Sequence, residues 1–168
     1  NPAGRLPITF PQTEVQLPMV YNHKPTGRGD DYHDLSGEPL FPFGYGLSYT
    51  HFKYSNLVFT KDTLKGTDTI KVRVDITNTG NKLGDEVIQM YIRDELSSLA
   101  TPVLSSKAFN RVQLNPGQTK TVEFDINASM LSLINEAGNR LAEEGSFRIM
   151  IGPNSKELVL KGNLYYKH

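Results

Sequence analysis

The stretch that most constrains this chain is PLFPFGYGLSYT, residues 39–50, which we call the strap. Pro42 and the pair Gly44 and Gly46 disfavour a regular helix, because proline lacks an amide donor and glycine loses the most backbone entropy on folding. Flexible linkers are polar, whereas the strap is uncharged and apolar, so we expect it to lie against another surface. Its predicted docking residues are Leu40, Phe41, Phe43, Tyr45, Leu47 and Tyr49. The composition therefore predicts a docked connector between two structural units.

The residues before the strap lack the pattern of an independent domain. Segment 1–38 is broken by prolines and glycines, and only 6–10 and 15–21 could form short extended pieces. A stretch of this length without its own core is better explained as the tail of a preceding domain followed by an interdomain loop. Its first residues, NPAGRLPITFP, lack the basic and then apolar pattern of a signal peptide, so we expect any targeting signal to lie upstream.

After the strap, residues 51–168 carry hydrophobic patterns with a period of two. From Ile70 to Ile76 the side chains alternate strictly between β-branched and charged, which indicates a half-buried strand. The segment 86–94 suggests a strand buried on both faces. The predicted strands are 52–60, 69–77, 86–94, 106–114, 119–127, 131–135, 145–151 and 157–165. This pattern predicts an all-β, immunoglobulin or fibronectin type III-like antiparallel β-sandwich of about seven strands, with an irregular N-terminal extension.

The charge balance and the residue inventory exclude several classes of function. The chain has 168 residues, and its 18 basic and 18 acidic residues cancel, so nothing indicates a nucleic-acid partner or an anionic membrane. No run is long enough for a membrane-spanning helix. The absence of cysteine excludes disulfides and thiolate metal sites, although it does not fix the cellular compartment.

The residues alone give no catalytic or metal site. The histidines are scattered, and the pair His23 and His33, with aspartates nearby, is more plainly explained as part of a solvated polar loop. No G-x-S-x-G elbow and no glycine-rich phosphate loop occurs. The adjacent acids at 30–31 and 143–144 would point to opposite sides of an extended chain, which does not suit the paired carboxyls of a glycosidase. We therefore predict no catalytic residue, no metal and no cofactor.

Two short motifs suggest other functions. The letters RGD at 28–30 spell an adhesion tripeptide, and NAS at 127–129 is a glycosylation sequon that only a glycosylating host would use. Matches of three residues often arise by chance. A stand-alone carbohydrate-binding or adhesion module is the alternative function, although such modules usually present exposed aromatics, often Trp, and this chain has no Trp.

Several segments together resemble one enzyme family. PLFPFGYGLSYTHF (39–52) matches nearly letter for letter a late motif of family 3 glycoside hydrolases of the periplasmic β-glucosidase type. The segments NPAGRLPITFP (1–11) and VYNHKPTGR (20–28) resemble the end of the family's second, α/β domain and the loop after it. Three further segments resemble the family's fibronectin type III-like domain: 84–94, 107–126 and 143–155. Ala108 departs from a glycine that is usual in the family, and Gly29 from a proline that is frequent.

The resemblance implies a non-catalytic structural module. In the family, the aspartate nucleophile and the glutamate acid/base lie upstream of the position that Asn1 resembles, so no residue here takes either role. The parent would be a retaining β-glucosidase that hydrolyses terminal β-D-glucosyl residues in carbohydrate metabolism, without a metal or cofactor. It would be periplasmic or secreted. The implied partners are the upstream catalytic domains of the same polypeptide, to which the strap would clamp the sandwich, and a β-glucoside bound by the parent enzyme.

Two hypotheses concern exposed segments. The loop 21–34 would approach the rim of the parent's active site, where His23, Arg28 and Tyr32 could stack on or hydrogen-bond a sugar. An interdomain loop without substrate contact is the simpler alternative. In the isolated chain the strap would either fold back on the sandwich or associate with a second copy.

Overall fold

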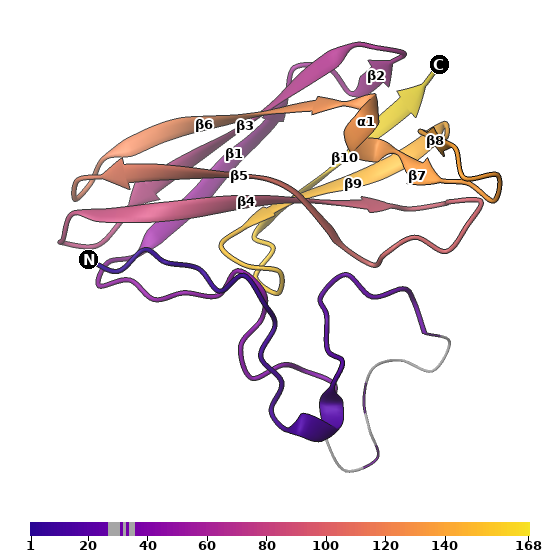
Figure 1. The fold of residues 1–168 in the computed structure, drawn as a ribbon. Helices are drawn as coiled ribbons and strands as arrows, with labels where there is room; N and C mark the ends of the chain where they lie inside the picture. The colour runs from indigo at the N-terminus through magenta and orange to yellow at the C-terminus, as the bar shows by residue number, and fades with distance from the viewer. Residues whose placement is uncertain (27–30, 32, 34–35) are drawn as a thin grey trace.

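The computed structural model describes residues 1–26, 31, 33 and 36–168, and it shows a β-sandwich with the N-terminal segment and the strap along one side (Figure 1). A three-stranded sheet has the order β1–β3–β6, and a five-stranded sheet has the order β2–β10–β9–β4–β5. The long strands are β1 (Phe52–Phe59), β3 (Thr69–Asn78), β4 (Gly84–Asp94), β5 (Ser105–Leu114), β6 (Thr119–Asn127), β9 (Gly145–Gly152) and β10 (Leu160–Lys167). The short elements are η1 (Glu14–Gln16), β2 (Thr63–Lys65), α1 (Ala128–Leu131), β7 (Leu133–Ile134) and β8 (Arg140–Leu141).

The predicted fold class is confirmed, and the long strands follow the predicted segments to within about three residues at each end. The short strands β2 and β8 were not predicted, because two or three residues cannot display a periodic pattern. Strand β2 also pairs parallel with β10, so the five-stranded sheet is mixed rather than wholly antiparallel. The predicted segment 131–135 contains the end of α1 and then β7, which pairs with β8 in a small sheet of its own.

The main core lies between the two sheets. The alternation in β3 is confirmed, because its β-branched residues from Ile70 to Ile76 are fully inaccessible to solvent while the charged residues between them are more exposed. Strand β6, the neighbour of β3 in the same sheet, contributes Val122, Phe124 and Ile126. The facing sheet contributes Ile88 and Met90 from β4, and Phe147, Ile149 and Ile151 from β9. Burying each such side chain stabilises the fold by about 2 kcal/mol, which gives the sandwich a core independent of the N-terminal segment.

Strand β4 is buried on both faces, as its composition predicted. One face joins the main core through Ile88 and Met90. On the other face, Tyr91 belongs to a second, smaller cluster that is covered by Tyr21 and Phe43. The segment before the sandwich therefore shields a part of the sheet that would otherwise face water.

The N-terminal segment and the strap run antiparallel, side by side. The amide of Leu6 donates to the carbonyl oxygen of Tyr45 at 2.8 Å, and the amide of Gly44 donates to that of Leu6 at 2.8 Å. Further along, the amide of Phe10 donates to the carbonyl oxygen of Phe41 at 2.8 Å. This irregular ribbon brings residues some 35 positions apart in the sequence into register and presents both segments to the sandwich together.

Candidate functional site: a strap docked on the sandwich

The buried side chain of Gln89 joins the strap to the sandwich. Its Nε2 donates to the carbonyl oxygen of Gly44 at 3.1 Å and to that of Pro153 at 2.5 Å. Its Oε1 accepts a hydrogen bond from the Tyr91 hydroxyl at 2.5 Å. One amide on β4 thereby connects the strap, the turn after β9 and the second cluster. Because such a buried amide is costly to leave unpaired, these contacts hold the strap in one position.

Gly44 meets two requirements that only glycine satisfies. Its φ of +82° lies in the left-handed region, which disfavours residues with a Cβ. A Cβ at this position would lie 2.2 Å from Oε1 of Gln89, well inside van der Waals contact. Gly46 is similarly close-packed, because a Cβ there would lie 2.3 Å from the carbonyl oxygen of Gly4. The two glycines of the strap therefore mark where its backbone approaches β4 and the N-terminal segment.

Phe43 is the aromatic anchor of the strap. Its ring stacks on Tyr21 with centroids 4.3 Å apart, and Tyr21 meets Tyr91 edge to face at 6.0 Å. The carbonyl oxygen of Phe43 accepts a hydrogen bond from the amide of Ser155 at 2.9 Å. Burial raises the pKa of the Tyr91 hydroxyl above its ordinary value, so this group stays protonated and donates to Gln89.

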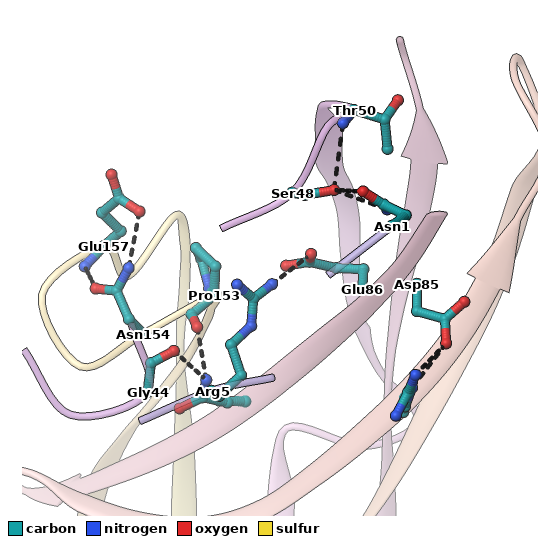
Figure 2. A network of polar contacts seen from close by, with 12 residues as sticks. Asn1, Arg5, Gly44, Ser48, Thr50, Asp85, Glu86, Pro153, Asn154 and Glu157 are labelled. Carbon is teal, nitrogen blue, oxygen red and sulfur yellow. Dashed lines mark hydrogen bonds and ion pairs between the residues drawn. The ribbon is translucent and has the colours of Figure 1, made fainter. Parts of the chain in front are cut away.

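A buried ion pair fixes the N-terminal segment to the same sheet. Nη2 of Arg5 lies 2.6 Å from Oε2 of Glu86, and the Tyr54 hydroxyl donates to Oε1 of Glu86 at 2.6 Å (Figure 2 shows Arg5 and Glu86). Burial is the largest influence on Glu86 and raises the pKa of its carboxyl, while Tyr54 and Arg5 oppose that shift. Arg5 therefore tethers the segment through a carboxyl group that β1 and β4 enclose.

The start of the N-terminal segment is also hydrogen-bonded to the end of the strap. Nδ2 of Asn1 donates to Oγ of Ser48 at 3.0 Å (Figure 2). The amide of Tyr49 donates to Oδ1 of Asn1 at 2.7 Å. The next residue, Thr50, donates from its hydroxyl to Oδ1 of Asn78 at 2.7 Å. These contacts fix the position at which the strap continues into β1, the first strand of the sandwich.

The strap's apolar side chains are divided between two directions. Phe43 and Tyr45 are partly buried, whereas Leu40, Leu47 and Tyr49 are 56%, 66% and 69% exposed. Phe41 is 37% exposed and stacks on Tyr45 with ring centroids 5.0 Å apart. We call the exposed apolar residues of the ribbon the outward set: Ile8, Phe10, Leu40, Phe41, Leu47 and Tyr49. What the outward set contacts in a longer chain stays a prediction.

Of the three residues predicted to lie at the rim, only His23 belongs to the described part of the chain, and its role at a rim stays a prediction. His23 is partly buried, its Nδ1 lies 3.0 Å from the carbonyl oxygen of Lys24, and its own carbonyl accepts from the amide of Val103 at 2.9 Å. It lines a cavity of about 630 Å³ together with Gln16. Arg28 and Tyr32 lie outside the described residues, as does the whole RGD motif at 28–30.

The residues that hold the strap were not singled out from the sequence. Gln89, Glu86 and Arg5 are polar residues whose partners lie tens of positions away. A polar side chain in β4, a strand otherwise buried on both faces, was the available signal, since buried polar groups need partners. Within the part of the chain that is described, no group of three or more His, Asp or Glu side chains could hold a metal ion. No helix there is long and apolar enough to cross a membrane.

Comparison with known proteins identifies the sandwich. Residues 86–155 match the family of fibronectin type III-like domains. The sandwich is a fibronectin type III-like domain. This match covers β4, β5, β6 and β9, the strands that form most of the core, and it includes both Glu86 and Gln89, which hold the N-terminal segment and the strap.

The fibronectin type III-like domain and its N-terminal segment are together similar to enzymes several times longer. The chain is 40% identical to a β-xylosidase of Formosa agariphila, covering 96% of this chain and 23% of that enzyme. It is 39% identical to a periplasmic β-glucosidase of Salmonella typhimurium, covering 92% of this chain and 22% of that enzyme. A solved β-glucosidase structure from Erythrobacter marinus superimposes with a TM-score of 0.93 at 36% identity, over 99% of this chain and 22% of that protein.

The resemblance to family 3 glycoside hydrolases is confirmed. The relatives are β-glucosidases and β-xylosidases of this family, and the chain matches their C-terminal region. It spans less than a quarter of the length of the curated relatives named above, at 23% and 22%.

Proposed function

We propose that this chain is a non-catalytic structural module of a retaining β-glucosidase. The fibronectin type III-like sandwich, residues 51–168, would be clamped to upstream catalytic domains by the strap, and residues 1–38 would complete the preceding domain. The observation that carries the proposal is the division of the strap into two sides. Its inner side is fixed to β4 through Gly44 and Phe43, while its outer side is apolar and exposed.

The outward set favours a partner from the same polypeptide. Six large apolar side chains on one two-stranded ribbon are a costly surface to leave in water, and contacts between domains normally cover such surfaces. The ribbon is held rigidly by Gln89 and by the ion pair of Arg5 and Glu86, so docking would require little further ordering. In the isolated chain the same residues would favour association with a second copy.

The substrate and the compartment of the parent follow from its relatives. Hydrolysis of a terminal β-D-glucosyl residue is the activity proposed for the parent, with both catalytic carboxyls in the upstream domains. One similar relative is named as periplasmic, which supports a periplasmic or secreted location. Because similar modules occur in a β-xylosidase and in β-glucosidases, we expect the upstream domains to determine the sugar specificity.

The cavity beside His23 supports a finer proposal. This cavity is bounded by the segment that leads to Arg28 and Tyr32, so those side chains would reach the rim of an active site formed upstream. They would stack on or hydrogen-bond the sugar without taking part in bond cleavage.

The direct test is reconstitution in two pieces. The upstream catalytic part, produced separately, should bind this chain with saturation in calorimetry, and a variant with Leu40→Ser and Leu47→Ser should bind at least tenfold more weakly. A matched variant, Leu96→Ser, changes an 86% exposed leucine on the loop after β4 and should bind normally. Equal binding by all three proteins would contradict the clamp.

Three further measurements separate the alternatives. The isolated chain should not cleave an aryl β-glucoside, and it should not bind cello- or laminari-oligosaccharides. Saturable oligosaccharide binding by the isolated chain would instead favour a stand-alone carbohydrate-binding module. Sedimentation velocity over a range of concentrations would reveal association of the isolated chain, which the Leu40→Ser and Leu47→Ser variant should weaken.

A further inference from the structure

A second cavity, of about 390 Å³, lies at the end of the sandwich away from the strap's anchor at Gly44. It is open to solvent on one side and is bordered by the end of β4, by the loop after β4, and by α1, β7 and β8. The last three elements lie together in Figure 1. Its walls include the apolar side chains of Ile92, Leu131 and Phe147. Small-molecule sites commonly have this size and this mixture of apolar walls with a few charged groups.

A β-bulge directs Lys107 into this cavity. In the register between β4 and β5, Met90 pairs with Ala108 and Tyr91 pairs with Ser106, so Lys107 is the extra residue without a partner. A bulge of this kind places two successive side chains on the same side of the strand. Ala108 packs against the main core, and Lys107 is partly buried beside it, lining the cavity. Bulges that redirect a side chain in this way are frequent next to functional sites.

The cavity carries an excess of positive charge. Lys24, Lys107 and Arg140 line it, against the single carboxylate of Asp94. Arg140 donates to Oγ of Ser132 at 3.3 Å, and within the described part of the chain Lys107 has neither an ion pair nor a hydrogen bond from its ammonium group. Burial, followed by the charge of Arg140, lowers the pKa of Lys107. The ammonium of Lys107 and the guanidinium of Arg140 line the same cavity, so an anion there would be attracted by both.

We propose that this cavity binds a small organic monocarboxylate, with its carboxylate between Lys107 and Arg140 and its apolar body against Ile92, Leu131 and Phe147. A monoanion with an apolar body suits the site better than inorganic phosphate does. Phosphate has no apolar body to cover Ile92, Leu131 and Phe147, and Asp94 would repel its second negative charge. The proposal does not depend on the clamp, because none of these residues belongs to the strap or to the outward set.

The test uses benzoate as the probe and the 168-residue chain as the protein. Sodium benzoate is titrated into ¹⁵N-labelled protein at constant ionic strength, and the backbone amides around Lys107 and Phe147 are followed. We expect saturable shifts with a Kd of about 1 mM or tighter. Lys107→Met should weaken binding at least tenfold, whereas Lys107→Arg should retain it. Lys53→Met, which changes an exposed lysine on β1, should bind like the unmodified chain.

Several outcomes would overturn the proposal. Linear, unsaturated shifts would mean that benzoate has no site, and equal binding of phosphate would indicate unspecific attraction to cations. Unchanged binding in Lys107→Met would show that the ammonium does not hold the carboxylate. The unmodified chain and Lys107→Arg keep the test informative if Lys107→Met fails to fold. If the isolated chain binds benzoate but the longer parent enzyme does not, the upstream domains cover the cavity, which is then an interdomain contact and not a ligand site.

Discussion

The side-chain amide of Gln89 donates a hydrogen bond to the carbonyl oxygen of Gly44 at 3.1 Å, and so a residue of β4 holds the backbone of a segment 45 positions earlier. The contact is possible because Gly44 has no side chain between its backbone and β4. It places the glycine-rich part of the strap against the strand that also belongs to the main core. The stability of the strap is therefore coupled to the fibronectin type III-like domain even without the rest of an enzyme.

This contact predicts an unusual sensitivity at Gly44. Gly44→Ala combines a left-handed φ of +82° with a Cβ that would lie 2.2 Å from Gln89 Oε1. We expect a loss of at least about 2 kcal/mol in the free energy of unfolding, from the backbone strain and from the displaced hydrogen bond. Urea denaturation of the isolated chain measures it.

Gly138 provides the matched control. Its φ of +80° is nearly the same, but a Cβ there would meet no atom within 4 Å. Gly138→Ala should therefore show the backbone cost alone, about 1 kcal/mol. Equal losses in the two variants would mean that the approach of Gln89 contributes nothing.

The enclosed carboxyl of Glu86 predicts a pH dependence. Because burial raises its pKa in the folded state above the ordinary value near 4.5, the folded protein holds this proton more tightly than the unfolded chain does. Its contribution to the free energy of unfolding is therefore full below pH 4.5 and falls as the pH rises through the raised pKa. Glu86→Gln removes the titration but can still accept the hydrogen bond from Tyr54.

The measurement is the difference in unfolding free energy between the unmodified chain and Glu86→Gln across pH 4 to 8. This difference should decrease with rising pH and then level off. The shifts of Asp75, Asp85 and Glu123, whose pKa values are lowered by their hydrogen bonds and ion pairs, are common to both proteins and cancel. A difference that increases with pH would show that Arg5 and Tyr54 outweigh burial.

The sandwich was predictable from sequence because its strands are long enough to repeat a pattern. The alternation from Ile70 to Ile76 identifies both the strand and its buried face, and the apolar character of β4 correctly indicates burial on two sides. Strand β2 escapes prediction, because its three residues form a strand only through the neighbouring edge of β10. Local pattern carries no information about such a partner.

The composition of the strap predicts that it contacts a surface, but it does not predict which residues make the contact. Its apolar, proline- and glycine-rich composition indicates contact with a surface. Which side chains turn inward depends on the turn from Pro42 to Tyr45, where the Tyr45 amide donates to the Pro42 carbonyl oxygen at 3.1 Å. Side chains two positions apart would point to the same side of an extended chain. Because of the turn, Phe41 is instead more exposed and Phe43 more buried. The partners Gln89 and Glu86 depend on tertiary packing, which a single sequence does not display.

The rim hypothesis predicts a kinetic effect in a full-length enzyme. Arg28→Ala and Tyr32→Ala should each raise KM for an aryl β-glucoside several-fold, because each removes a contact to the sugar, while the free energy of unfolding stays the same. A matched substitution on the outer face of β3, Lys71→Ala, should leave both constants unchanged. If KM and kcat are normal in both rim variants, the loop has no contact with substrate.

If upstream domains cover the outward set, one substitution should destabilise the full-length enzyme but not the isolated chain. Leu47 is 66% exposed, so Leu47→Ala should change the free energy of unfolding of the isolated chain by no more than about 0.5 kcal/mol. In a full-length enzyme the upstream domains would bury this side chain, and its truncation should cost about 2 kcal/mol. Differential scanning calorimetry of both proteins reports the change. Leu96→Ala, at an 86% exposed leucine, should be neutral in both, and a neutral Leu47→Ala in the enzyme would mean that this part of the strap stays in solvent.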